Sequence, residues 1–344
     1  MLSRLFEALY NKVLVNIVVK RASFDIYIEI LSKKDVVSHL QKSFDTLSVS
    51  REMIEYIQSY TKESPYHYIA VLNMSADQGA IVGCEKKKLQ EFEEKHAVQY
   101  MCHEKKWAHY SDKEAIKMIM KSYKEIGCDY IFSPYSLLVD FFKDKVNGPT
   151  AMFVLMQDSF VTLAIFEQGE LLYAEHLDMQ TSGEYDDEIL SQTIENDDNI
   201  DFSDQAGIDL EDVSVLDNME ELEDLDDFGD IEDLDSIEEI DEFSENKDLE
   251  EEFHDVVEEP SPETESSFNE DYQRFSLIQS ALGNYYTDEE TESQFIENVY
   301  IADGVSMSSD LKRYLEEEMF LNVYIRQTNI GTELAELVKM ELSL

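Results

Sequence analysis

The chain has 344 residues, enough to bury a substantial core, and we expect it to form two lobes. Its 77 acidic side chains outnumber the 27 basic ones, which gives a formal net charge of −50. A charge of this sign argues against a nucleic acid partner, whose phosphates would be repelled. No apolar run approaches the roughly eighteen residues that a membrane-spanning helix needs, so we expect membrane contact only through partners.

Strand-like and helix-like stretches alternate along the chain. The periodicity predicts strands, in chain order, at 13–19, 24–30, 66–75, 79–83 and 128–134, in three successive runs within 151–177, at the start of 299–315 and at 322–327. It predicts helices at 1–12, 36–63, 111–127, 135–145 and 272–287, in the second half of 299–315 and at 331–343. This order, with paired strands at the head of each half, indicates an α/β protein with a mixed sheet in each lobe.

The helix predicted at 111–127 has the clearest sequence boundaries. Ser111 is at the N-cap position, Glu114 three residues later completes a capping box, and Gly127 provides a C-terminal stop.

Charge divides the chain into segments. Residues 184–271 hold 39 acids and a single base, whereas residues 1–150 hold 20 acids and 21 bases. We therefore expect a first lobe at 1–150, with 328–344 packing back on it. The second lobe would comprise 151–183 and 272–327, interrupted by the acidic insertion at 184–271.

The acidic insertion contains too few apolar side chains to offset the loss of chain entropy on folding, which predicts disorder. Two interpretations remain open: a solubilising loop, or an acidic-apolar segment that folds on a basic partner. The apolar anchors of such a segment would be Leu225, Phe228, Ile231 and Leu234. A partial match to a calcium loop at 224–235 places Phe228 where an oxygen ligand belongs, so we predict no metal site there.

The three cysteines, Cys84, Cys102 and Cys128, occur at no spacing typical of a disulfide framework. We expect reduced thiols in a cytoplasmic protein. A cluster of His96, Cys102, His103 and His109, with Cys84 nearby, matches no zinc pattern in its spacing, so we predict no metal site here either.

Four stretches carry a family resemblance: "KEAIKMIMKSYKEIGCDYIFSPYSLLVDFF" (113–142), "AMFVLMQDSFVTLAIFEQGELLYAEHL" (151–177), "DYQRFSLIQSALGNYY" (271–286) and "ENVYIADGVSMSSDLKRYLEEEMFLNVYI" (297–325). In this order they resemble the actin-like PilM proteins of type IV pilus assembly and the related cytoplasmic module of GspL in type II secretion. The resemblance implies an actin-like fold of two lobes, in which two hairpin turns and a strand–turn–helix corner would hold ATP and Mg²⁺.

The stretches that would hold the nucleotide depart from the family pattern. Actin-like ATPases grip phosphates with Asp-x-Gly turns, because close backbone approach favours Gly and the Asp positions Mg²⁺. The first turn, "IVVKRAS", lacks both residues, and "VLM" (154–156) stands where Asp-Ile-Gly is expected. At the corner only one of three expected glycines remains. The remnant nucleotide positions are Lys20, Ser23, Asp158, Ser159, Asp303 and Gly304.

These departures predict a largely lost nucleotide site and no cofactor. We expect a non-enzymatic cytoplasmic scaffold, peripheral to the inner membrane, in a type IV pilus, type II secretion or DNA-uptake platform. By resemblance, its partner would be the cytoplasmic tail of a membrane protein, held in a groove of the first lobe. The acidic insertion would contact the assembly motor ATPase. Two alternatives are an active actin-like ATPase with divergent phosphate loops, which would use ATP and Mg²⁺, and an acidic adaptor acting mainly through residues 186–271.

Overall fold

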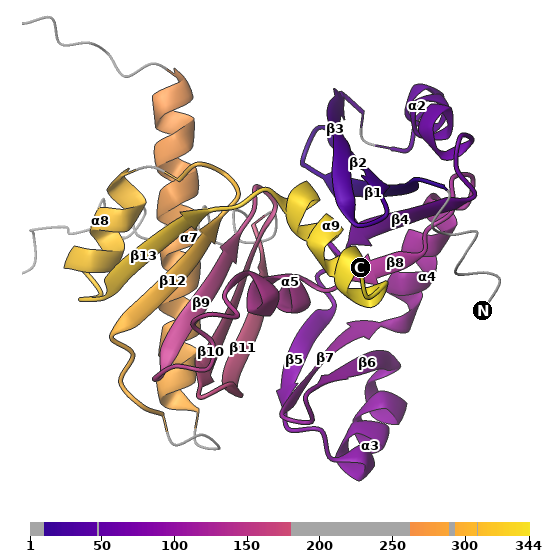
Figure 1. Ribbon diagram of the computed structural model, residues 1–344. Coiled ribbons are helices and arrows are strands. Elements are labelled where there is room, and N and C mark those ends of the chain that lie inside the picture. The colour runs from indigo at the N-terminus through magenta and orange to yellow at the C-terminus, as the bar shows by residue number, and fades with distance from the viewer. Residues whose placement is uncertain (1–9, 47, 180–261, 289–292, 308) are drawn as a thin grey trace, which may run out of the picture. The chain divides into compact units, whose positions relative to one another are not determined.

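The computed structural model describes residues 10–46, 48–179, 262–288, 293–307 and 309–344. In these ranges the chain forms three sheets and the helices that pack on them (Figure 1). None of the helices described has the length and hydropathy required to span a bilayer.

The first sheet has the strand order β3-β2-β1-β4-β8. Its strands are β1 (Lys12–Val19), β2 (Phe24–Ser32), β3 (Asp35–Phe44), β4 (Tyr66–Leu72) and β8 (Tyr130–Phe132). The first three strands are antiparallel neighbours, while β4 runs parallel to β1, and β8 runs parallel to β4. The strand β8 is therefore one open edge of this sheet.

The second sheet repeats this plan with the order β11-β10-β9-β12-β13. Its strands are β9 (Ala151–Met156), β10 (Phe160–Glu167), β11 (Glu170–Asp178), β12 (Asn298–Asp303) and β13 (Asn322–Gln327). Again three antiparallel strands are followed by two parallel ones. This duplication of a mixed sheet is the actin-like α/β arrangement, so the predicted fold class is confirmed. Most of the acidic insertion lies outside the described residues.

A third, smaller sheet has the order β5-β7-β6. Its strands are β5 (Gln78–Val82), β6 (Val98–His103) and β7 (Trp107–Asp112), and helix α3 (Lys86–His96) connects β5 to β6. Both pairs of strands are antiparallel, so β6 is an edge strand.

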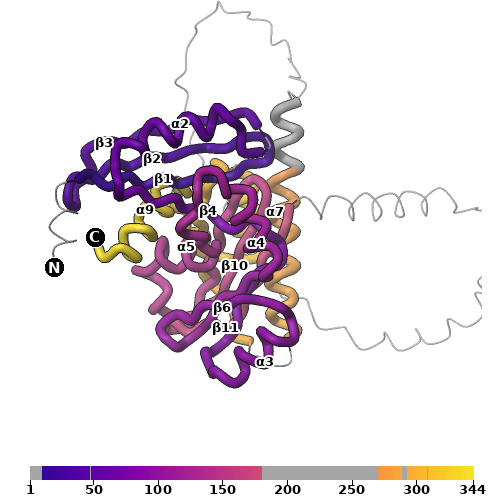
Figure 2. The backbone as a smooth tube through the Cα atoms, turned by 90° about the vertical axis from the view of Figure 1, so that its right-hand side faces the viewer, coloured from indigo at the N-terminus to yellow at the C-terminus, as the bar shows by residue number. Residues whose placement is uncertain are grey.

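Helices cover both faces of the first sheet (Figure 2). The helix α2 (Arg51–Thr61) packs Met53 and Ile57 against one face, and α9 (Ile330–Glu341) packs Ala335 and Val338 against the other. The remaining described helices are α4 (Lys113–Ser122), α5 (Pro134–Phe141), α7 (Pro262–Thr287) and α8 (Ser309–Glu317). One apolar cluster includes side chains of both five-stranded sheets, among them Tyr27 and Phe153.

The helix predicted at 36–63 is wrong in its first half, where β3 pairs with β2. The amphipathic pattern becomes a helix only at Arg51, after Ser50, whose hydroxyl accepts a hydrogen bond from the Met53 amide at 3.2 Å. The strand depends on a partner supplied by another segment, which local periodicity does not report.

The N-cap predicted for 111–127 is also wrong, by one residue. The Asp112 carboxylate accepts a hydrogen bond from the Ala115 amide at 2.8 Å and caps α4. Ser111 remains in β7, where its hydroxyl accepts a hydrogen bond from the Asn73 amide group. Gly127 lies beyond the helix with a φ of 83°, a left-handed conformation that glycine adopts at little cost.

Candidate functional site

The two hairpin turns expected to hold phosphates contact each other directly. The Arg21 amide in the β1–β2 turn donates a hydrogen bond to the Asp158 carboxylate in the β9–β10 turn, at 3.0 Å. A cavity of about 270 Å³ beside this contact is lined by Lys20 and Ser159, among others. The structure therefore brings together remnant positions that are far apart in the sequence.

The basic side chains of the first turn are engaged by carboxylates of the chain itself. The Lys20 ammonium lies 2.6 Å from the carboxylate of buried Asp25, and this hydrogen bond raises the pKa of Lys20. The Arg21 guanidinium donates to Glu270 of α7 at 2.6 Å. Glu270 also accepts from Arg274 at 2.9 Å, so one carboxylate bridges two guanidinium groups.

The other polar groups of these turns have structural roles or no partner. The Ser23 carbonyl accepts a hydrogen bond from the Lys20 amide at 2.8 Å and closes the first turn. The Ser159 hydroxyl is buried without a hydrogen-bond partner among the residues described.

The strand–turn–helix corner is closed by its own carboxylate. Asp303 is 0% exposed, and its side chain accepts hydrogen bonds from the backbone amides of Val305 and Met307, both at 3.0 Å. The Gln327 side-chain amide donates to the same carboxylate at 2.6 Å. Asp303 thus occupies the donors that an anionic ligand would need at this turn.

Gly304 permits a close approach between the corner and the end of β9. Its amide donates to the Met156 carbonyl at 3.1 Å. A Cβ added at this position would lie 1.9 Å from the Gln157 side-chain nitrogen. The space beside Gly304 is therefore filled by the Gln157 side chain and is not open to a ligand.

A nucleotide phosphate does not fit this arrangement of residues. Among the described groups, the amides of the corner and the cations of the first turn already bind carboxylates. A fourth carboxylate, Asp158, joins the two turns, so a phosphate would meet negative charge on both sides. The candidate partner anchors Leu225, Phe228, Ile231 and Leu234 lie outside the described residues.

A second concave site, which the sequence did not reveal, lies between two sheet edges. A groove of about 640 Å³ is lined by Met101 and His103 of β6, by all three residues of β8 and by residues of α5 and α9. A smaller cavity of about 70 Å³ continues between β6 and β8. Both strands are edges of their sheets, so their outer backbone groups face no further strand in the described part of the chain.

The rim of this groove, which we call the β6–β8 groove, is acidic. Its lining contains four carboxylates, those of Glu104, Asp129, Asp140 and Glu341, and one lysine, Lys143. The lysine lies 3.4 Å from Asp140. Met101 is 56% exposed and Met340 50% exposed, so apolar surface remains accessible here.

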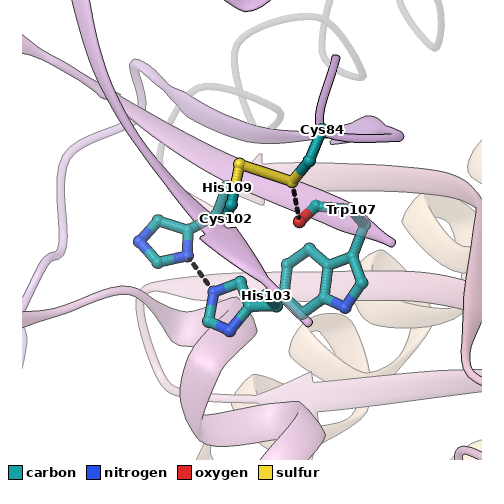
Figure 3. The surroundings of a disulfide bond; sticks show 5 residues. All are labelled: Cys84, Cys102, His103, Trp107 and His109. Atoms are coloured by element: carbon teal, nitrogen blue, oxygen red, sulfur yellow. Dashed lines mark hydrogen bonds between the residues drawn. A yellow bond between two sulfur atoms is a disulfide. The ribbon is translucent and has the colours of Figure 1, made fainter. Parts of the chain in front are cut away.

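Two histidines, His103 and His109, line the groove. Figure 3 shows their rings next to each other. The Nε2 of His103 and the Nδ1 of His109 lie 2.7 Å apart, and the His103 ring stacks on Trp107 with centroids 4.1 Å apart. Burial, and after it the neighbouring His103, lowers the pKa of His109 to about 3. Burial also lowers the pKa of His103 to about 4. Both rings are therefore neutral at pH 7.

The opposite face of β6 carries a disulfide between Cys84 and Cys102, whose Cα atoms are 6.0 Å apart (Figure 3). The expectation of three reduced thiols is therefore wrong for this pair. The two residues are 18 positions apart, and the fold of the small sheet, which cysteine spacing does not report, brings them together. Cys128 is free. The described residues contain no group of three or more side chains that could hold a metal ion.

Two models of protein families match this chain, and one of them covers more than half of it. A family model described as "Domain of unknown function (DUF8341)" matches residues 152–343, more than half of the sequence. The chain belongs to the DUF8341 family. A second model, "Domain of unknown function (DUF8569)", matches residues 10–139 of the same chain. No curated protein matches it.

Several solved structures are similar to this DUF8341 chain at low sequence identity. A Bacteroides thetaiotaomicron protein with an actin-like ATPase fold and unknown function is 12% identical, with a TM-score of 0.49 over 94% of this chain and 95% of its own. A PilM–PilN type IV pilus biogenesis complex is 11% identical, with a TM-score of 0.47 over 93% and 89%. MreB 5 of Spiroplasma citri is 9% identical, with a TM-score of 0.41 over 96% and 97%. At such identities a likeness concerns the fold alone.

Proposed function

We propose that the protein is a non-enzymatic, nucleotide-independent scaffold that holds a peptide of a membrane protein in the β6–β8 groove. The observation that carries the proposal is the pair of open strand edges on either side of an acidic groove. An extended peptide can add to such an edge through main-chain hydrogen bonds, while pockets select its side chains.

The chemistry of the groove favours one class of peptide. Its apolar surface at Met101 and Met340 suits apolar side chains, and its four carboxylates suit lysine or arginine. Cytoplasmic segments next to membrane spans carry an excess of these two residues. The cytoplasmic tail of a single-span inner-membrane protein therefore matches the groove. The resemblance to PilM proteins implies the same class of partner, in a pilus, secretion or DNA-uptake platform.

In this proposal the groove belongs to the first lobe, residues 1–150 with 328–344, because α9 contributes to its wall. The protein would act in the cytoplasm at the inner membrane. The closed corner at Asp303 supports a role without a cofactor, since binding at a strand edge requires no nucleotide chemistry. Contact between the acidic insertion and a motor ATPase remains part of the proposal.

The test is fluorescence anisotropy with labelled synthetic peptides from the cytoplasmic tails of single-span inner-membrane proteins of the same organism. We expect a tail with basic and apolar residues to bind. Met101→Lys should weaken binding at least about tenfold, or about 1.4 kcal/mol, because it adds positive charge to the groove. Met120→Lys is a matched control, since Met120 is 55% exposed on α4, against 56% for Met101. Equal affinities of the two variants, or no binding by any tail, would overturn the proposal.

A thermal-shift measurement separates this function from the ATPase alternative. A ligand that binds only the folded state must raise the melting temperature. We expect millimolar ATP with Mg²⁺ to leave it unchanged, whereas a rise of several degrees would support the ATPase. If the isolated peptide 186–271 bound the tail as tightly as the whole chain does, the acidic adaptor would be the better account.

A further inference from the structure

The disulfide between Cys84 and Cys102 ties together the two outer strands of the small sheet. Its strand order is β5-β7-β6; Cys84 follows the end of β5 and Cys102 belongs to β6, so the bond crosses the central strand β7. The Cys84 Sγ lies 2.9 Å from the carbonyl oxygen of Trp107 in β7 (Figure 3). The bond and the chain between the two cysteines therefore enclose α3 and most of β6.

The helix α3 has few features that would stabilise it without this bond. Its 11 residues are fewer than the roughly 12 to 15 that an isolated helix needs in water. Its N-cap residue, Glu85, makes no side-chain hydrogen bond to the helix, all of which is described. The helix begins with Lys86, Lys87 and Lys88, and the helix dipole disfavours positive charge at this end. Of its described residues only Leu89 is buried.

The strand β6 is also weakly held. Among the described strands it pairs only with β7, and of its six residues, all described, only Val98 is buried. Segments with few buried apolar contacts open locally at a low cost in free energy. A disulfide that closes a loop of 18 residues restricts the open state. We therefore expect the bond to provide much of the order of α3 and β6.

The disulfide is accessible to a thiol reagent. Cys102 is exposed and Cys84 is half-buried. Exposed disulfides are reduced more easily than buried structural ones, and the labile ones include those with regulatory roles. The function proposed above places the chain in the cytoplasm, where glutathione and thioredoxin-type dithiols keep most thiols reduced.

The bond lies next to the β6–β8 groove but outside it. Cys102 stands between Met101 and His103, which both line the groove. Because side chains alternate along a strand, Cys102 points to the opposite face of β6. A reagent can therefore act on the disulfide without entering the groove, while any loss of order in β6 changes one of the groove's two edges.

We infer that Cys84 and Cys102 form a reversible thiol–disulfide site that sets the order of α3 and β6, with a cellular monothiol or dithiol as the reductant. A thiolate of the reductant attacks the exposed Cys102 Sγ and forms a mixed disulfide. The bond to Cys84 breaks, and Cys84 takes up a proton that its thiol can donate to the Trp107 carbonyl. A second reductant thiolate attacks the reductant's own sulfur in the mixed disulfide. This step releases Cys102, which also takes up a proton, and leaves the reductant oxidised to a disulfide.

The consequence for the groove rests on the proposed function. An ordered edge is pre-organised for the addition of a peptide strand, because less conformational entropy is lost on binding. The oxidised protein should therefore bind the membrane-protein tail more tightly than the reduced protein does.

The first measurement uses no peptide. The full-length Cys128→Ser variant, in which only the pair can react, is equilibrated from both directions with millimolar mixtures of reduced and oxidised glutathione. Alkylation and mass spectrometry then count the free thiols. We expect the pair to change from oxidised to reduced as the share of reduced glutathione rises. A pair that stays oxidised in reduced glutathione alone, or stays reduced in oxidised glutathione alone, would overturn the inference.

Hydrogen exchange of the same variant locates the effect. Reduction should accelerate exchange of the α3 and β6 amides at least about tenfold, while the amides of β1 and β4 keep their rates. A further variant with Cys84→Ser and Cys102→Ser should exchange like the reduced protein whether or not reductant is present. Equal exchange of α3 and β6 in the oxidised and reduced proteins would overturn the inference.

Fluorescence anisotropy with the tail peptide separates the inference from the proposed function. We expect the oxidised protein to bind the tail at least about fivefold more tightly than the reduced protein. Equal affinities of the two forms would overturn the control of the groove by the disulfide. If no tail binds either form, the proposed function fails, whereas the glutathione and exchange measurements still decide whether the pair is a reversible site.

Discussion

The amide of Arg21 and the carboxylate of Asp158 lie 3.0 Å apart and join two hairpin turns that are 137 residues apart in the chain. In the fold that the resemblance implies, a nucleotide would stand between these turns. Here a single hydrogen bond to a charged acceptor makes the connection.

Asp158→Ala should lower the free energy of unfolding by about 1 to 2 kcal/mol, because the Arg21 amide loses a charged acceptor. Asp158→Asn keeps an acceptor oxygen and should lose less than half of that. Urea denaturation measures both variants. Hydrogen exchange should accelerate at the Arg21 amide in the alanine variant. Unchanged exchange at this amide would mean that the bond contributes nothing to holding the turns together.

Asp303→Ala should lower the free energy of unfolding by more, roughly 2 to 4 kcal/mol in total. It leaves two backbone amides and the Gln327 side chain without their buried acceptor. Asp303→Asn retains one oxygen and should fall between the wild type and the alanine variant. Urea denaturation again gives the values. If Asp303→Ala were as stable as the wild type, the carboxylate could not be closing the corner.

The buried ring of His109 should make the free energy of unfolding depend on pH. It is 9% exposed, and burial followed by His103 lowers its pKa to about 3. In the unfolded chain the ring gains a proton near pH 6.5, so the unfolded state binds more protons below that pH, and stability falls as the pH decreases. Between pH 7 and pH 5 this group should remove about 2 kcal/mol of stability.

His109→Gln should abolish that part of the pH dependence. The free energies of unfolding of the wild type and the variant, measured by urea denaturation, should therefore approach each other as the pH falls from 7 to 5. Lys33→Gln, on an exposed turn, serves as a control that leaves the histidines in place. Parallel curves for the wild type and His109→Gln would contradict the assignment of the effect to this ring.

The number of reactive thiols tests directly whether the disulfide is present. The chain unfolded without reductant should show one reactive thiol, that of Cys128, and the reduced chain should show three. In the folded protein Cys128 should react slowly at pH 8, because burial raises its pKa to about 11. Cys84→Ser should lower stability by about 3 kcal/mol, from a loop of 18 residues. Three reactive thiols before reduction would exclude the bond.

Local patterns predicted the second sheet well, because β9 to β11 follow one another through short turns and carry strand-like runs. The same approach failed for β3. Its Val36, Val37 and Leu40 fall at helical spacing, i to i+3 and i+4, while its strand conformation depends on pairing with β2. It also missed β6 and β7, where histidine, cysteine and polar residues obscure the alternation.

The candidate site, too, could be predicted only in part from the sequence. The sequence indicated that two of the three expected glycines are missing from the corner, but not that the Asp303 carboxylate caps its own turn. That role depends on the positions of three donors, one of which comes from β13. The β6–β8 groove could not be predicted, because its two edges belong to different sheets and meet only in the folded chain.

The carboxylate of Asp303 is covalently part of the loop whose amides it binds. Each copy of the protein is therefore made with this acceptor already in place, in equal measure in a starved cell and in a growing one. If the protein is the nucleotide-independent scaffold proposed above, the cellular ratio of ATP to ADP would not change the conformation of this corner. The amount of the closed form would then follow the synthesis and degradation of the polypeptide rather than energy supply.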